Sequence, residues 1–84
     1  MTGSSTSAFY IFGVAETELE RAQRHIAEGE MRIARQSALV DELKASGHAR
    51  LAVDAERLLT EFLALQAEYE RHAGRLADAH YEER

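Results

Sequence analysis

The stretch LVDELKASGHARLAVDAERLL, residues 39–59, decides the fold, because two helical patterns of apolar residues meet there across one glycine. Lys44 and Gly47 form a helix-ending signal, since a cation in the last turn is followed by a residue that adopts left-handed backbone angles at little cost. So short a break between two long helices favours antiparallel packing. The stretch therefore predicts an antiparallel helical hairpin.

Each predicted helix carries a seam of mostly apolar or small residues that recur in steps of three and four. The first seam is Leu19, Ala22, Ile26, Gly29, Ile33, Gln36, Val40 and Leu43. The second is Leu51, Ala55, Leu58, Phe62, Leu65, Tyr69, His72 and Leu76. A repeat of about 3.5 residues keeps one side of a helix facing a partner, as in a coiled coil. Folding the seams about the turn predicts that Gly29 lies opposite Leu65.

The 84 residues are enough for one domain, and the predicted fold class is all-α. Residues 1–14 are predicted to form a polar tail and an aromatic arm, Phe9–Phe12, that either docks on the hairpin or another subunit or stays free. The hairpin is predicted over residues 15–84. Its parts are helix 1 at about 15–46, a turn at 47–48 and helix 2 at about 49–81. Thr17 followed by Glu20 is a capping-box pattern, which would delay the start of helix 1 slightly.

The composition excludes several classes of function. Cysteine is absent, which removes disulfides, thiolate nucleophiles and thiolate zinc sites. The net charge of −5 argues against general nucleic-acid binding, because phosphates would repel such a chain. No stretch is long and apolar enough to predict a membrane span, and a cytoplasmic protein is expected.

Apolar residues beyond the two seams predict self-association. Leu59 and Leu63 form a second row on helix 2, and Met31, Ala34 and Ala38 lie on helix 1 away from its seam. A wide apolar surface on a two-helix unit is unfavourable in water. We therefore expect a homodimer that forms an antiparallel four-helix bundle, with these five residues in the interface.

A row of basic residues on helix 1 allows two interpretations. Arg21, Arg24, Arg32 and Arg35 share one side of the helix, together with His25. Such a row could bind an acidic protein, phosphate or nucleic acid. The preferred interpretation is a solvated surface, because Glu20–Arg24 and Glu28–Arg32 have the spacing of helix-stabilising ion pairs.

The histidines do not indicate a metal site or an active site. A bundle metal centre would use a Glu-x-x-His pattern, which does not occur in the chain. Glu68 and His72 could supply two ligands, although His72 is more simply explained as a seam residue. A dimerising hairpin with His25 is also the architecture of the phosphotransfer domain in sensor histidine kinases, but Ile26 replaces the acidic residue that usually follows the histidine. We therefore predict no catalytic residue, cofactor or metal.

Several segments together resemble a group of short bacterial proteins of uncharacterised function. The segments are HIAEGEMRIARQ at 25–36, LVDEL at 39–43, SGH at 46–48 and AERLLTEF at 55–62. The shared features are a His-x-x-x-Gly start, an Ile-x-x-Gln step, a glycine turn and an Ala-x-x-Leu-Leu-x-x-Phe second helix. The resemblance covers residues 25–76 and implies a bacterial origin and a helical hairpin, with no activity attached.

The function that these patterns favour is a small, non-enzymatic, homodimeric interaction module with a further protein partner still to be identified. The alternative is a regulator of signalling or transcription that binds an acidic partner, phosphate or nucleic acid through its arginine row.

Overall fold

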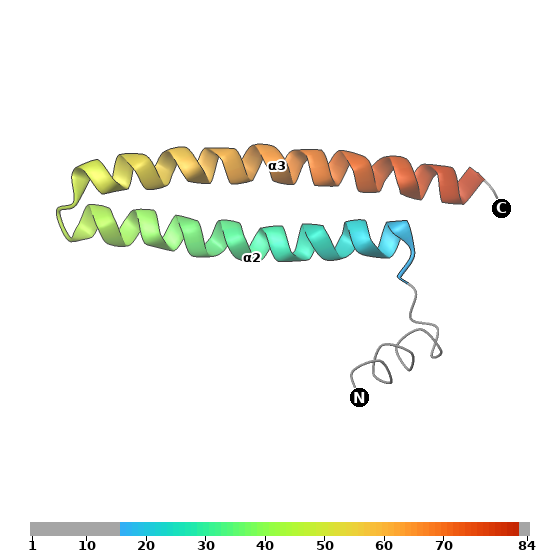
Figure 1. Cartoon of the computed structure of the whole chain (residues 1–84), viewed down its shortest axis with the longest axis horizontal. Helices are drawn as coiled ribbons and strands as arrows, with labels where there is room; N and C mark the ends of the chain where they lie inside the picture. The colour runs from blue at the N-terminus through green and yellow to red at the C-terminus, as the bar shows by residue number, and fades with distance from the viewer. Residues whose placement is uncertain (1–15, 83–84) are drawn as a thin grey trace, which may run out of the picture.

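Two long antiparallel helices joined by a tight turn make up the described part of the chain (Figure 1). The computed structural model describes residues 16–82, with side chains up to residue 79. Helix α2 spans Glu18–Ala45 and helix α3 spans Ala49–Glu82. The predicted all-α hairpin is confirmed. The predicted tail and aromatic arm lie outside the described residues.

Helix α2 begins with the capping box that the sequence pattern indicates. The backbone N–H of Glu20 donates to Thr17 Oγ1 at 3.0 Å, and the backbone N–H of Thr17 donates to Glu20 Oε1 at 2.9 Å. These bonds satisfy donors that have no partner inside the helix. The helix therefore begins at Glu18, directly after Thr17.

Helix α2 ends at a glycine turn. Gly47 has a φ of +80°, in the left-handed region that side chains with a Cβ rarely adopt. The N–H of His48 donates to the carbonyl of Leu43 at 2.9 Å, and the N–H of Gly47 donates to the carbonyl of Lys44 at 3.2 Å. Both bonds satisfy carbonyls at the helix end. Beside the turn, Lys44 Nζ lies 2.8 Å from Glu56 Oε2 and links the two helices.

The predicted seam of α2 is correct, but half of the predicted seam of α3 is wrong. All eight seam residues of α2 are buried or partly buried. On α3 the buried and partly buried residues of the seam are Ala52, Ala55, Leu59, Phe62, Gln66, Tyr69, Ala73 and Leu76. Leu51, Leu58, Leu65 and His72, which the leucine pattern favours, are exposed instead. At every second position of the α3 seam, the buried residue is the one that directly follows the predicted residue in the sequence.

The shift follows from how two helices fit together at close range. Gly29 faces Gln66, not Leu65, and a Cβ at Gly29 would overlap the Gln66 amide. Gln66 Nε2 donates to the carbonyl of Ile26 at 2.9 Å, and Gln36 Nε2 donates to the carbonyl of Ala55 at 2.9 Å. Each helix thus contributes one glutamine that bonds to the backbone of the other. These bonds set the register along the hairpin.

The contact between Gly29 and Gln66 predicts an unusual effect of alanine. Gly29→Ala gains about 1 kcal/mol of helix propensity. It also displaces a buried amide, and an unsatisfied buried group costs about 1–3 kcal/mol. We expect a net loss of about 1 kcal/mol in thermal or urea unfolding at fixed protein concentration. With Gln66→Ala already present, Gly29→Ala should become stabilising, and a loss in both backgrounds would contradict this contact.

The turn supplies a second prediction with a matched control. Gly47→Ala should lower the free energy of unfolding by about 1–2 kcal/mol, because the Cβ strains a left-handed residue. Gly74 lies inside α3 with no atom within 4 Å of the Cβ position. Gly74→Ala should therefore raise the free energy of unfolding by about 0.5–1 kcal/mol. Equal effects of the two substitutions in chemical unfolding would contradict the assigned turn.

Candidate functional site

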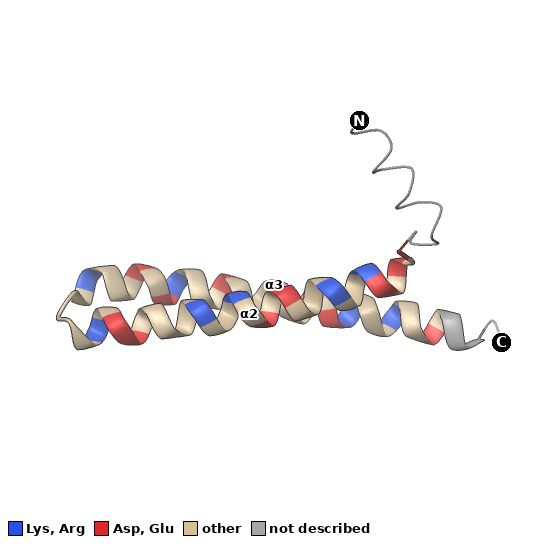
Figure 2. Ribbon diagram, turned by 90° about the horizontal axis from the view of Figure 1, so that it is seen from below, with Lys and Arg blue, Asp and Glu red and all other residues tan. Residues whose placement is uncertain are grey.

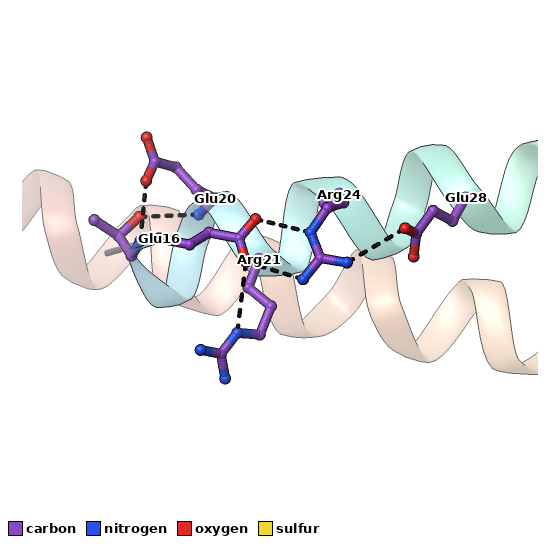
Figure 3. A network of polar contacts seen from close by, with 6 residues as sticks. Glu16, Glu20, Arg21, Arg24 and Glu28 are labelled. Atoms are coloured by element: carbon purple, nitrogen blue, oxygen red, sulfur yellow. Dashed lines mark hydrogen bonds and ion pairs between the residues drawn. The ribbon is translucent and has the colours of Figure 1, made fainter. Parts of the chain in front are cut away.

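The arginine row begins in an ion-pair network at the start of α2 (Figure 3). Arg24 donates to both carboxylate oxygens of Glu16, at 2.8 and 2.9 Å, and to Glu28 Oε2 at 3.3 Å. Arg21 Nε lies 3.7 Å from Glu16 Oε1. Glu16 precedes the helix and bends back over its first turns to reach both arginines. The two arginines at this end of the row are therefore paired within the hairpin.

The bidentate contact changes the acidity of both partners. The hydrogen bond from Arg24 is the main cause that lowers the pKa of Glu16 from its ordinary 4.5, and the positive charge of Arg24 adds to it. The same bond to Glu16 raises the pKa of Arg24. Both groups are accordingly charged at neutral pH. The network leaves little uncompensated positive charge for an acidic ligand.

The remaining members of the row have different surroundings. The guanidinium of Arg32 lies 5.8 Å from the centroid of the Phe62 ring, in the range of a cation–π contact. The His25 and Tyr69 rings have centroids 5.3 Å apart and are tilted by 39°. Arg35 is exposed and has no ion pair among the described residues. The structure thus splits the predicted row into paired, packed and free members.

An open depression lies at the end of the hairpin away from the turn. Its lining residues are Glu18, Arg21, Ala22, His25 and His72. His72 is exposed at its edge and does not occupy the seam position predicted for it. The other proposed ligand, Glu68, is paired with Arg71 at 2.8 Å. Within the described residues no group of three or more histidine, aspartate or glutamate side chains is arranged to hold a metal ion.

A serine and a histidine meet in the turn, a contact that was not predicted from the residue pattern. Ser46 Oγ lies 2.8 Å from His48 Nδ1. The Ser46 hydroxyl also donates to the carbonyl of Glu42 at 2.9 Å. The direction of the hydrogen bond between Ser46 and His48 depends on the tautomer of the imidazole ring. The bond from the Ser46 hydroxyl to the Glu42 carbonyl satisfies an acceptor at the helix end.

Four leucines form the main apolar surface of the hairpin. We call it the leucine face: Leu39 on α2, with Leu51, Leu58 and Leu65 on α3. Their exposed fractions are 42%, 53%, 41% and 41%. Leu51, Leu58 and Leu65 recur every seven residues, so they share one flank of α3. The sequence analysis placed these three inside the hairpin and therefore missed this surface.

The dimer residues predicted from the sequence lie elsewhere. Met31, Ala34 and Ala38 are exposed on the outer side of α2, and Leu63 is exposed on the flank of α3 opposite the leucine face. Leu59 is partly buried in the seam with α2 and is less available to a second subunit. Basic and acidic residues are interspersed along both helices (Figure 2).

Comparison with known proteins adds no family. The chain matches no family model, and no curated protein or solved structure is significantly similar to it. Of the two helices described, neither has a stretch long and apolar enough to cross a membrane. The resemblance to short bacterial hairpin proteins remains a prediction.

The ion-pair network predicts a pH effect confined to the start of α2. Because the folded-state pKa of Glu16 lies below its ordinary value of 4.5, the pair stabilises the first turns above that value. The contribution is lost as the pH falls through the lower, folded-state pKa. The protection of the Glu20 and Arg21 amides against exchange, measured relative to their intrinsic exchange rates, should fall on acidification in this window.

A carbon-13 titration of the Glu16 carboxyl gives the direct measurement. Arg24→Gln should return the pKa of Glu16 towards 4.5, because it removes the main hydrogen bond. Arg35→Gln is the matched control and should leave the titration unchanged. A Glu16 pKa that does not respond to Arg24→Gln would contradict the network.

Proposed function

We propose that the protein is a non-enzymatic helical interaction module that acts as a homodimer. The observation that carries the proposal is the small size of the hairpin's core. Its buried apolar residues are Ala22, Val40, Ala52, Ala55 and Ala73. Within the described residues no large side chain is fully buried, while seven large apolar residues are 41–60% exposed. So much exposed apolar area is characteristic of an interaction surface.

Energetic reasoning supports a partner of similar shape. A helix pair of this length buries few atoms, and small domains are often stabilised by oligomerisation. Burial of apolar area is worth roughly 25 cal/mol per Å². Exposed leucines spread along one flank can gain that energy along the whole length of another helical hairpin.

The contacts of the arginine row argue against the alternative of binding phosphate, nucleic acid or an acidic protein. Arg24 and Arg21 are already paired with Glu16, and Arg32 packs on Phe62. A net charge of −5 also opposes association with polyanions. We therefore assign Arg21, Arg24 and Arg32 a structural role in the proposed function.

The proposal extends to the setting of the protein. A cysteine-free module that gains its stability from self-association is suited to the cytoplasm, where disulfides rarely form. A further protein partner would then bind the assembled dimer, on surfaces that dimerisation leaves free.

Concentration dependence tests the proposed function. If the folded state is a dimer, the midpoint of thermal unfolding should rise with protein concentration, because association is coupled to folding. Sedimentation equilibrium should give twice the mass of the 9.4 kDa chain at micromolar concentration. A single 9.4 kDa species with a concentration-independent midpoint would contradict the proposal.

A further inference from the structure

The leucine face lies on one definite side of the hairpin. The depression at the open end brings together His25 of α2 and His72 of α3. On α2, His25 belongs to the same seven-residue series as Leu39. On α3, His72 belongs to the series of Leu51, Leu58 and Leu65. The two series therefore flank the same side of the seam. The Lys44–Glu56 ion pair occupies flanking positions on the opposite side.

Charged residues form an edge beside this face on α2. Arg21, Glu28, Arg35 and Glu42 recur every seven residues and alternate in sign. Arg21 and Glu28 are engaged with Glu16 and Arg24. Arg35 and Glu42 have no ion pair among the described residues, and they lie on either side of Leu39 along the helix. One unpaired cation and one unpaired anion thus border the leucine face.

We propose that a second copy of this chain packs leucine face to leucine face, about a two-fold axis near Leu39 and Leu58. This inference rests on the proposed function, because it assigns the surface and the geometry of the homodimer. The two copies of α2 run antiparallel across the axis, and the open ends point in opposite directions. A two-fold interface of this kind uses the same patch on both subunits.

Charge complementarity selects this arrangement. An axis near Leu39 places Arg35 beside Glu42 of the partner subunit, and the symmetry repeats the pair. Leu51 then meets the partner's Leu65, so that all four leucines of each copy are covered. On α3, Asp54 approaches the partner's Glu61, and Arg57, which lies 3.8 Å from Asp54, offsets the negative charge.

The arrangement with both turns at the same end is less favourable. The register set by Gln66 and Gly29 would then pair Arg35 of one copy with Glu61 of the other, but it would also bring three like-charged pairs into proximity. These pairs join a residue of one copy to a residue of the other: Glu42 with Asp54, Glu28 with Glu68, and Arg21 with Arg75. Like charges held close together destabilise an interface.

An antiparallel arrangement shifted along the helix is also less favourable. It would pair Glu28 with the partner's Arg35, but Glu28 is already bonded to Arg24. It would also place Arg32 of one copy against Arg32 of the other. Leucines of one copy would then face histidines of the other. The axis near Leu39 avoids each of these contacts.

Substitutions at two exposed leucines of α3, one inside the leucine face and one outside it, test which surface forms the dimer. Leu58→Glu should weaken dimerisation at least about 100-fold in sedimentation equilibrium, because a charge replaces an apolar contact at the axis. Leu63→Glu, on the same helix and 50% exposed, should leave the dissociation constant within about threefold. Circular dichroism confirms that both variants stay helical. Loss of the dimer with Leu63→Glu and its persistence with Leu58→Glu would overturn the inference.

A cross-linking experiment tests the position of the axis. The chain contains no cysteine, so one introduced cysteine reports on one position. Oxidised Leu39→Cys should form a covalent dimer, because a residue at a two-fold axis lies near its own copy. Met31→Cys, 60% exposed and on another side of α2, should stay monomeric on a denaturing gel. The reverse result would overturn the inference.

A charge exchange tests the orientation. Arg35→Glu and Glu42→Arg should each weaken dimerisation by about fivefold to tenfold, and the double variant should recover most of the loss. Glu30→Arg, outside the face, is the control. No recovery in the double variant would overturn the antiparallel pairing. A wild-type chain that stays monomeric would instead contradict the proposed function itself.

Discussion

The small side chains along the seam set how closely α2 and α3 approach, and the other features of the hairpin depend on that approach. Gly29 leaves room for the Gln66 amide, which bonds to the opposite backbone at 2.9 Å. Alanines at Ala52, Ala55 and Ala73 keep the gap narrow along α3. A narrow gap between two helices cannot enclose a leucine fully. Larger apolar side chains in the seam, such as Ile26 and Leu59, are therefore only partly buried, and further leucines lie at its flanks.

Much of the fold could be predicted from the sequence. Only one seam fits α2, because polar residues bound it on both sides except at Leu39. The glycine turn has a definite hydrogen-bonding pattern. Two seams are possible on α3. Ala55, Phe62, Tyr69 and Leu76 can combine with the row that begins at Leu51 or with the row that begins at Ala52. Hydropathy favours the leucines, whereas close packing favours the alanines and Gln66. The glycine in α2 was the available signal, because a glycine inside a helix indicates a close neighbour.

The candidate sites were harder to predict, because their character depends on contacts between distant residues. Helical spacing correctly grouped the arginines on one helix. It could not reveal that Glu16, outside the helix, reaches Arg24 through two hydrogen bonds. Nor could it reveal the leucine face, because the error in the α3 seam assigned those residues to the interior. An error of one residue in register moves a surface from the inside of a helix pair to the outside.

A narrow seam leaves the leucine face exposed, and that exposed face is the basis for the proposed second copy of the chain. Electron spin resonance between labels on Gln23→Cys, near the open end of α2, tests this sequence of causes most directly. With the axis near Leu39, each label lies 16 residues from the axis, so the two labels should be about 48 Å apart, at 1.5 Å of rise per residue. A separation under about 30 Å, or no interaction between labels at all, would contradict the account.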